Sequence, residues 1–372
     1  MAVKRNSNLQ AFLLLVKTGL WIDAEVKIPD IDAEGWQEVY RLATEQSVMG
    51  LVLAGLEKSK VKPPQEELLQ WIGEVQMIEQ QNKSMNEFAA QLIEKLRKNN
   101  IYAILVKGQG IAQCYERPSW RACGDVDLLL SDSDYGMAKK QLVPMAQSIE
   151  EENEYNQHLA LIIDQWSVEL HGTLRSGLWR RIDKTLDEIQ NAVFCDGYVR
   201  TWLNGNTQVN LLRADEDVFF VFTHILQHFF QEGIGLRQIC DWCRLLWTYR
   251  MDFDVDLLGE RLRKAGVMTE WKSFAVLAVD YLGMPVEAMP FYDSCFKVKG
   301  ERILEFVLET GNFGHNRDYS YQKKYPYVIM KAISLWKHIV DFSRYFVIFP
   351  ADSIRVMCRK INVGFVFVAK GK

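Results

Sequence analysis

Two aspartates, Asp125 and Asp127, stand two residues apart at the start of the apolar run Leu128 to Leu130. Side chains two residues apart on a strand point to the same face of a sheet, so their carboxylates converge. Aspartate is disfavoured in strands, and two like charges about 6 to 7 Å apart repel one another. Such a pair must be solvated, paired with a basic side chain, or bound to a cation. Mg²⁺ binds one or two carboxylates and keeps positions for phosphate oxygens, so the pair suits phosphoryl or nucleotidyl transfer.

A third carboxylate is available in the segment "SVELHG", where Ser167, Glu169 and His171 point to one face of a predicted strand. Glu169 can complete a triad with the aspartate pair. It would bind the catalytic metal, Mg²⁺ or Mn²⁺, and draw the proton from an attacking hydroxyl whose pKa the metal lowers. The alternative is that Glu169 is a solvated residue on the outer face of a hairpin.

Basic residues for the phosphates precede the aspartate pair. Lys107 ends a predicted strand, and Arg121 lies four residues before Asp125. Both can bind a triphosphate, or they can simply neutralise the aspartates. Gly108 and Gly110 would let backbone N–H groups approach a phosphate at the start of the following helix.

The elements that must position these residues follow from apolar spacing. Helical spacing predicts a helical first quarter, with one long helix over 66–98. Predicted strands cover 101–106 and 124–130, and "HLALIID" and "SVELHG" form a hairpin across a tight "DQW" connection. A helix opens at the Ser and Asp residues of 131–134, and residues 192–212 are predicted to be a short β segment.

Helices return from 215 to about 281, and the last ninety residues are a mixture of helices and loops. We therefore expect an α+β fold, in which a small mixed sheet is flanked by helical regions. The expected divisions are an N-terminal helical region over 1–98, a core over 99–212, and a mainly helical region over 213–372.

Composition excludes several classes of protein. The net charge of −4 and a pI near 6.0 predict no strong attraction to nucleic acid. The seven cysteines lack the spacing of a disulfide framework, which favours reduced thiols and a cytoplasmic protein. Lys17 interrupts the apolar N-terminal run, so no signal peptide is expected. The aromatic stretch 327–349 carries five basic or acidic side chains, which predicts a core or partner-facing helix rather than a membrane span.

The segment "ILVKGQGIAQCYERPSWRACGDVDLLL", a helix and then "SVELHG" resemble a little-studied bacterial family of the nucleotidyltransferase superfamily, which has the polymerase-β-like fold. The residues that fall on the family's pattern are Lys107, Gly108, Tyr115, Arg121, Gly124, Asp125, Asp127, Glu169 and His171. Farther on, "THILQHFF" and "LRQICDW" resemble its helical lobe, with His224 or His228 and Asp241 at matching places. The resemblance covers about Ile101 to Leu246.

The resemblance implies a metal-dependent transfer of a nucleotidyl group from an NTP to an acceptor, which can be a small molecule, a sugar or a protein side chain. It implies that Lys107, Gly108, Gln109, Arg121 and Gly124 bind the phosphates. Most of the superfamily has Gly-Ser where this chain has Lys107, Gly108 and Gln109. A catalytically weakened nucleotide-binding or protein-interaction module on the same fold is therefore the alternative.

Two histidines, His224 and His228, are four residues apart on a predicted helix. They can bind a second metal together with Asp241, because residues four apart share one face of a helix. Their aromatic neighbours favour the simpler interpretation that they are buried, hydrogen-bonded core histidines. In a third arrangement, Asp241 accepts a hydrogen bond from His228 between two lobes.

Overall fold

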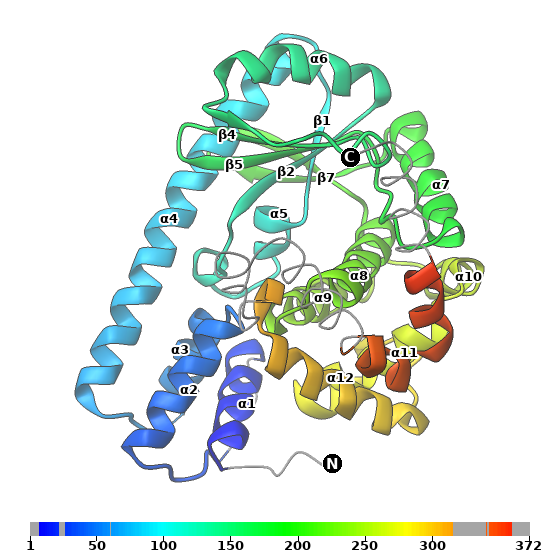
Figure 1. Ribbon diagram of the computed structural model, residues 1–372. Helices are drawn as coiled ribbons and strands as arrows, with labels where there is room; N and C mark the ends of the chain where they lie inside the picture. The colour runs from blue at the N-terminus through cyan, green and yellow to red at the C-terminus, as the bar shows by residue number, and fades with distance from the viewer. Residues whose placement is uncertain (1–6, 22–26, 60, 315–339, 341, 359–372) are drawn as a thin grey trace, which may run out of the picture.

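The computed structural model describes residues 7–21, 27–59, 61–314, 340 and 342–358. A mixed sheet lies at one end of the molecule, with helices of the N-terminal and C-terminal regions below it in Figure 1. The predicted α+β class, with a small mixed sheet between helical regions, is confirmed.

Within the described residues the sheet has seven strands in the order β3-β4-β5-β2-β1-β7-β6. Their bounds are β1 Ala103–Val106, β2 Asp125–Leu130, β3 Ser148–Ile149, β4 His158–Ile163, β5 Trp166–His171, β6 Arg200–Asn204 and β7 Thr207–Leu211. β2 pairs with β5, and β1 with β7, in parallel, and the other neighbours are antiparallel. The central strands are β5, β2 and β1, and they carry the residues that the sequence singles out.

The two faces of β2 have different environments because successive side chains alternate. Val126, Leu128 and Leu130 are buried in one apolar cluster with residues of α4 (Gln65–Lys98) and α6 (Asp132–Leu142). Asp125 and Asp127 lie on the opposite face, which looks toward α8 (Ala214–Gln231) and α9 (Leu236–Thr248). The apolar face therefore anchors the strand while its other face carries the carboxylates.

The N-terminal region consists of α1 (Ser7–Leu20), α2 (Ala33–Glu45), α3 (Met49–Lys58) and the long α4. Trp71 and Val75, near the start of α4, are buried with α1, α2 and α3. Met85 and Leu92, farther along the same helix, are buried against the sheet. α4 thus belongs to both apolar clusters, and it runs down one side of the molecule in Figure 1.

Asn82 stands between these two halves of α4 and is only 1% exposed. Its Nδ2 donates to the carbonyl oxygens of Ser119 and Arg121, at 2.8 and 2.7 Å. A buried polar side chain is stable only when it is hydrogen-bonded, so Asn82 fixes the chain that leads into β2.

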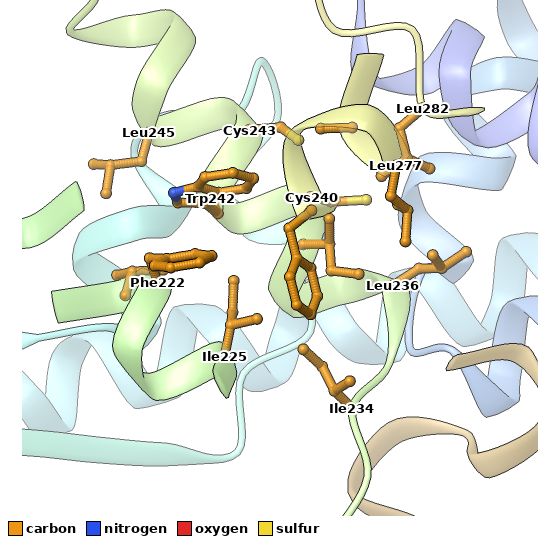
Figure 2. Close-up of a cluster of buried hydrophobic side chains, with 14 of the residues drawn as sticks. Phe222, Ile225, Ile234, Leu236, Cys240, Trp242, Cys243, Leu245, Leu277 and Leu282 are labelled. Atoms are coloured by element: carbon orange, nitrogen blue, oxygen red, sulfur yellow. The ribbon is translucent and has the colours of Figure 1, made fainter. Parts of the chain in front are cut away.

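α7 (Arg180–Asp196) belongs to the 99–212 segment and packs beside the C-terminal helices. The C-terminal region contains α8, α9, α10 (Val255–Ala265), α11 (Met268–Val276) and α12 (Lys297–Thr310), with helical turns at 342–348 and 350–358. Phe222, Trp242 and Leu277 are among the buried side chains that join α8 and α9 to the helical turn Leu277–Tyr281, which follows α11 (Figure 2). Cys240 and Cys243, a Cys-x-x-Cys pair on α9, lie in the same core, and burial raises the pKa of both thiols. They are therefore packing residues.

Most of the predicted elements are confirmed, including the long helix, the hairpin of β4 and β5, and the strands at 103–106 and 125–130. The prediction of β structure from 192 is wrong at its start, because residues 192–196 form the last turn of α7. The buried apolar residues of this segment recur at helical spacing: Ile182, Leu186, Ile189 and Val193. The burial of this face stabilises a helix and outweighs the β propensity of Val193 and Phe194.

Two further predictions concern the remaining parts of the chain. The aromatic stretch 327–349 lies mostly outside the described residues. Among the helices that are described, none has the length and apolar character needed to cross a bilayer.

Candidate active site

Lys107 ends β1 with an unusual backbone conformation, φ 57° and ψ −145°. It is followed by Gly108 (φ 36°) and the short helix α5 (Gly108–Ala112). A residue other than glycine rarely adopts a positive φ, because its Cβ is then strained against the backbone. Strained backbone conformations of this kind concentrate at functional sites. Here it sends the chain into α5 while the Lys107 ammonium lies against the carboxylates of β2.

Asp127 and Glu169 are direct neighbours in the parallel register of β2 and β5, and Asp125 pairs with Ser167. One carboxylate oxygen of each of Asp125, Asp127 and Glu169 lies within 4.8 Å of the others. The structure therefore brings together the three predicted carboxylates, from two adjacent strands. Three convergent oxygen donors fit Mg²⁺ or Mn²⁺, which prefer carboxylate ligands.

Basic side chains surround these carboxylates. The Lys107 Nζ lies 2.6 Å from Asp127 Oδ1 and 4.0 Å from Glu169 Oε2. His171 Nε2 lies 2.8 Å from the same Asp127 oxygen, and His158 Nε2 lies 3.1 Å from Glu169 Oε2. Because Asp127 is only 1% exposed, its charge is compensated by these neighbours rather than by solvent.

The pKa values of the cluster differ between neighbours. Repulsion by Asp127, together with burial, raises the pKa of Asp125 to about 6. Burial opposes ionisation of Glu169, but hydrogen bonds from His158 and His171 and the charge of Lys107 hold its pKa below the ordinary value. Burial also opposes protonation of His171, yet Asp127 and Glu169 raise its pKa. Neighbouring carboxylates with pKa values moved in opposite directions are typical of catalytic sites.

Two cavities meet at the carboxylates. The larger, about 450 Å³, is lined by Asp125, Glu169 and Lys107 on the sheet side and by Phe220, His224 and Gln227 of α8 on the other, among other residues. A smaller one, about 50 Å³, extends from Lys107, Gly108 and Asp127 toward Arg237 and Gln238 of α9. The carboxylates of Asp125 and Glu169, between the sheet and α8, are therefore accessible to ligands through the larger cavity.

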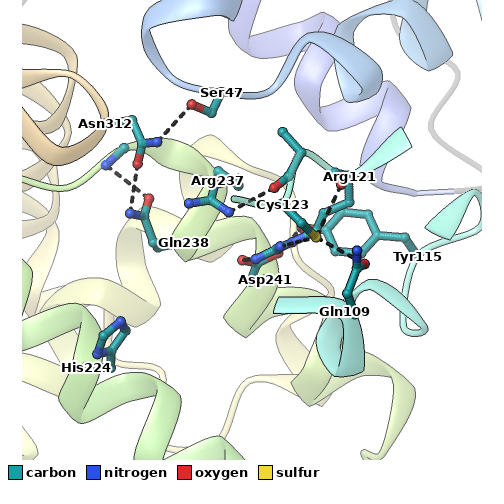
Figure 3. Close-up of polar contacts among 12 residues, drawn as sticks. Ser47, Gln109, Tyr115, Arg121, Cys123, His224, Arg237, Gln238, Asp241 and Asn312 are labelled. Atoms are coloured by element: carbon teal, nitrogen blue, oxygen red, sulfur yellow. Dashed lines mark hydrogen bonds and ion pairs between the residues drawn. The ribbon is translucent and has the colours of Figure 1, made fainter. Parts of the chain in front are cut away.

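Arg121 lines the smaller cavity, so its predicted contact with the triphosphate stays a prediction, but its guanidinium is paired with a carboxylate of α9. Its Nη2 and Nε bind both oxygens of Asp241, at 2.6 and 3.0 Å, and its Nη1 lies 2.7 Å from Cys123 Sγ. Tyr115 donates to the same carboxylate at 2.7 Å (Figure 3). A bidentate carboxylate stabilises a buried guanidinium, so the pair joins the loop before β2 to α9. This arrangement also differs from the alternative in which Arg121 neutralises Asp125 and Asp127, because the carboxylate that its guanidinium binds is that of Asp241.

Gln109 also points away from the carboxylates. It is 1% exposed, donates to Asn82 Oδ1 at 3.3 Å, and accepts from the Cys123 thiol at 3.2 Å. Its side chain therefore supports the Arg121 network of Figure 3, in contrast to the predicted phosphate contact. Gly124 lies just before β2, and a Cβ added there would meet no atom within 4 Å. Gly108 adjoins Asp125, where a Cβ would stand 3.4 Å from the backbone oxygen.

His224 and His228 contact one another through their Nε2 atoms at 3.1 Å and line the larger cavity. Asp241, the third member of the two alternatives for these histidines, is instead engaged by Arg121 and Tyr115. Burial, with the nearby charge of Lys107, moves the pKa of His224 well below its ordinary value. Figure 3 shows His224 apart from the Asp241 network.

Two residues of the site were missed by the sequence analysis. His158 faces His171 across the hairpin, and the two-residue turn between Ile163 and Trp166 would have predicted that pairing by counting. Arg237 lines the smaller cavity, and its Nη1 donates to the carbonyl oxygen of Ala122 at 2.9 Å. No local pattern identifies Arg237, because its approach to β2 depends on how α9 packs.

The fold and the resemblance point to one class of protein, the nucleotidyltransferases. The sequence model of a family described as "Uncharacterised nucleotidyltransferase" matches residues 32–283, and the chain belongs to this family. The match begins at the N-cap of α2 and includes the whole sheet and α8 to α11. No curated protein and no solved structure matches the chain.

Proposed function

We propose that the protein transfers a nucleotidyl group from an NTP to an acceptor, with Asp125, Asp127 and Glu169 holding Mg²⁺ or Mn²⁺. The observation that carries the proposal is the convergence of these three carboxylates within 4.8 Å at the edge of a polar cavity. Membership of a nucleotidyltransferase family supports it. A divalent ion held there would lower the pKa of the attacking hydroxyl and offset charge on the phosphates.

In the proposed reaction, the acceptor hydroxyl oxygen forms a bond to the α-phosphorus of the NTP. The bond from that phosphorus to the α,β-bridging oxygen breaks, and pyrophosphate leaves with the bonding electron pair. The hydroxyl proton passes to a carboxylate, and we assign this role to Glu169, which faces the larger cavity. Holding both reactants in line beside these strands would contribute to the rate by replacing a bimolecular encounter with a positioned one.

The phosphates would lie against Lys107 and Arg237, whose side chains line the smaller cavity beside Asp125. Both carry positive charge toward the carboxylates, and charge-assisted contacts to phosphate are strong in a buried setting. Gly108 has no side chain to obstruct an approach at the end of β1.

The test is thermal stability of the chain with Mg²⁺ and each of the four NTPs. We expect at least one Mg²⁺–NTP pair to raise the melting temperature, because a ligand that binds the folded state stabilises it. Asp125→Asn with Asp127→Asn should abolish the shift. Asp132→Asn, an exposed aspartate of α6 on the other side of the sheet, is the matched control. No shift with any NTP would contradict the proposal.

A second measurement separates transfer from binding. Pyrophosphate release should depend on both the NTP and an acceptor, and Glu169→Gln should lower its rate by at least about 100-fold, as removal of a general base does. A thermal shift without pyrophosphate release from any acceptor would instead favour a nucleotide-binding module. The buried position of Gln109 is the observation that keeps this second function in view.

A further inference from the structure

One side of the carboxylate cluster is bordered by imidazoles rather than by oxygen ligands. His158 and His171 are paired residues on β4 and β5, and their ring centroids lie 4.8 Å apart. Glu169 Oε2 lies 3.1 Å from His158 Nε2 and 3.4 Å from His171 Nε2. The three ligand atoms, two nitrogens and one oxygen, all lie within 4.8 Å of one another.

These separations match those of metal ligands. With bonds of about 2.1 Å to nitrogen or oxygen, neighbouring ligand atoms stand about 3.0 Å apart in an octahedron and about 3.4 Å apart in a tetrahedron. The two observed nitrogen–oxygen distances, 3.1 and 3.4 Å, fall at these values. Both histidine nitrogens therefore stand at ligand distances from the shared Glu169 oxygen, and the two nitrogens lie within 4.8 Å of one another.

The strands also give the site rigidity and access. The hairpin fixes both histidines by its register, and all three residues line the larger cavity, which supplies room for water or a further ligand. Sites built on strands hold their geometry better than sites built on loops. Three protein ligands with an open position are typical of reactive metal sites.

We propose that His158, His171 and Glu169 form a second cation site, selective for a transition metal such as Zn²⁺ or Co²⁺. Imidazole ligands favour these ions, whereas Mg²⁺ prefers oxygen. The site extends the proposed function, because it shares Glu169 with the triad. Its existence does not depend on nucleotidyl transfer, since metal binding is measured without nucleotide.

Binding at this site would change a contact of the neighbouring one. His171 Nε2 now lies 2.8 Å from Asp127 Oδ1, and a nitrogen that donates its lone pair to a metal cannot also donate a proton to Asp127. Occupancy by a transition metal therefore removes one hydrogen bond from Asp127. The two sites are expected to be thermodynamically coupled, and the coupling is reciprocal.

The test is titration of the chelator-treated full chain with Co²⁺, followed by visible absorption, with Zn²⁺ added as competitor. We expect one equivalent of Co²⁺ to develop d–d bands that Zn²⁺ abolishes and excess Mg²⁺ does not. His158→Ala should weaken Co²⁺ binding by more than about tenfold, the smallest loss expected even for an outer partner of a metal site. His171→Gln provides a second variant should the first not fold.

His228→Ala is the matched control, because this histidine lines the same cavity but lies outside the three-residue cluster. Equal loss in His158→Ala and His228→Ala, or Co²⁺ binding unchanged in both ligand variants, would overturn the proposal. Asp125→Asn separates the two sites: it should abolish the Mg²⁺–NTP shift and retain Co²⁺ binding. Failure of the Mg²⁺–NTP shift alone would contradict the proposed function and leave the cation site supported.

Discussion

Lys107 combines a strained backbone with a charge contact. Its φ of 57° and ψ of −145° lie in a region that glycine occupies easily, and its ammonium contacts the buried Asp127. A conformation of this kind costs on the order of 1–3 kcal/mol when the residue has a Cβ. The side chain of this strained residue faces the proposed nucleotide site. Strained backbone conformations concentrate at functional sites of this kind.

This strain can be measured by comparing Lys107→Gly with Lys107→Ala. Both variants remove the ammonium, so both lose its contact with Asp127 and should lose the Mg²⁺–NTP shift. Only the alanine variant keeps the backbone strain. Glycine also gives the unfolded chain more conformational entropy, which opposes its advantage, so we expect the glycine variant to be more stable by a net amount of about 1 kcal/mol. Urea denaturation gives the difference, and an alanine variant of equal or greater stability would refute the assignment of strain.

The Arg121–Asp241 ion pair allows a test of how a buried pair affects the free energy of unfolding, because both side chains are buried between the sheet and the helical region. Asp241→Ala leaves a guanidinium without its carboxylate, and we expect a loss of about 3–5 kcal/mol. The double variant Arg121→Met with Asp241→Leu should lose less than the single one. Denaturant midpoints of the three chains provide the measurement, and a double variant less stable than Asp241→Ala would argue against this role.

At the scale of elements, α1 and α3 pack closely because small residues stand where they cross. A Cβ at Gly55 of α3 would overlap the carbonyl oxygen of Leu15, and one at Gly19 of α1 would overlap that of Leu51. Side chains at these positions would push the helices apart. Gly73, in the interior of α4, has open space around it.

We therefore expect opposite effects from two chemically identical substitutions. Gly55→Ala should destabilise the chain by about 1–3 kcal/mol, because extra volume in a packed contact forces backbone shifts. Gly73→Ala should stabilise it by about 0.5–1 kcal/mol, because alanine is the better helix former. Urea denaturation measures both changes: no loss of stability in Gly55→Ala would show that the α1–α3 crossing adapts, and a loss in Gly73→Ala would contradict the open space at that position.

Elements with a strong local pattern could be predicted from the sequence, and their long-range partners could not. The apolar run after Asp125 identified β2, and alternation in "SVELHG" placed Glu169 and His171 on one face. α7 was partly missed because β-prone residues close a helix whose apolar spacing is regular. Arg121 and Asp241 are 120 residues apart, and only the packing of α9 brings them together.

At the scale of the whole molecule, a buried carboxyl links the last described turns to the helical region. Glu270 of α11 is 3% exposed and contacts Asp352 of the helical turn 350–358. Burial, with the contact to Asp352, raises the pKa of Glu270 to about 9, although Lys299 opposes the shift. Glu270 is therefore protonated in the folded chain at neutral pH.

This pKa predicts how stability changes with pH. Between about pH 4.5, the ordinary pKa of the group, and about pH 9, the folded chain binds more protons at Glu270 than the unfolded chain. Its contribution to stability is therefore complete below this window and is lost as pH rises, by up to about 1.4 kcal/mol per pH unit. Glu270→Gln should flatten this slope in urea denaturation at pH 6 to 9. Parallel slopes for the two chains would contradict the pKa.

The long helix α4 has a mechanical consequence for the site. Its 34 residues make a rod of about 51 Å, packed at one end with α1 to α3 and at the other with the sheet. On such a lever, a tilt of one degree at the first end moves the other by about 0.9 Å. Asn82 sits near its middle and binds the loop that enters β2. Because Asn82 stands halfway along, a rotation of the N-terminal helices by about two degrees would displace it, and with it the support of Asp125 and Asp127, by about 0.9 Å, a distance comparable to the tolerance of a catalytic site.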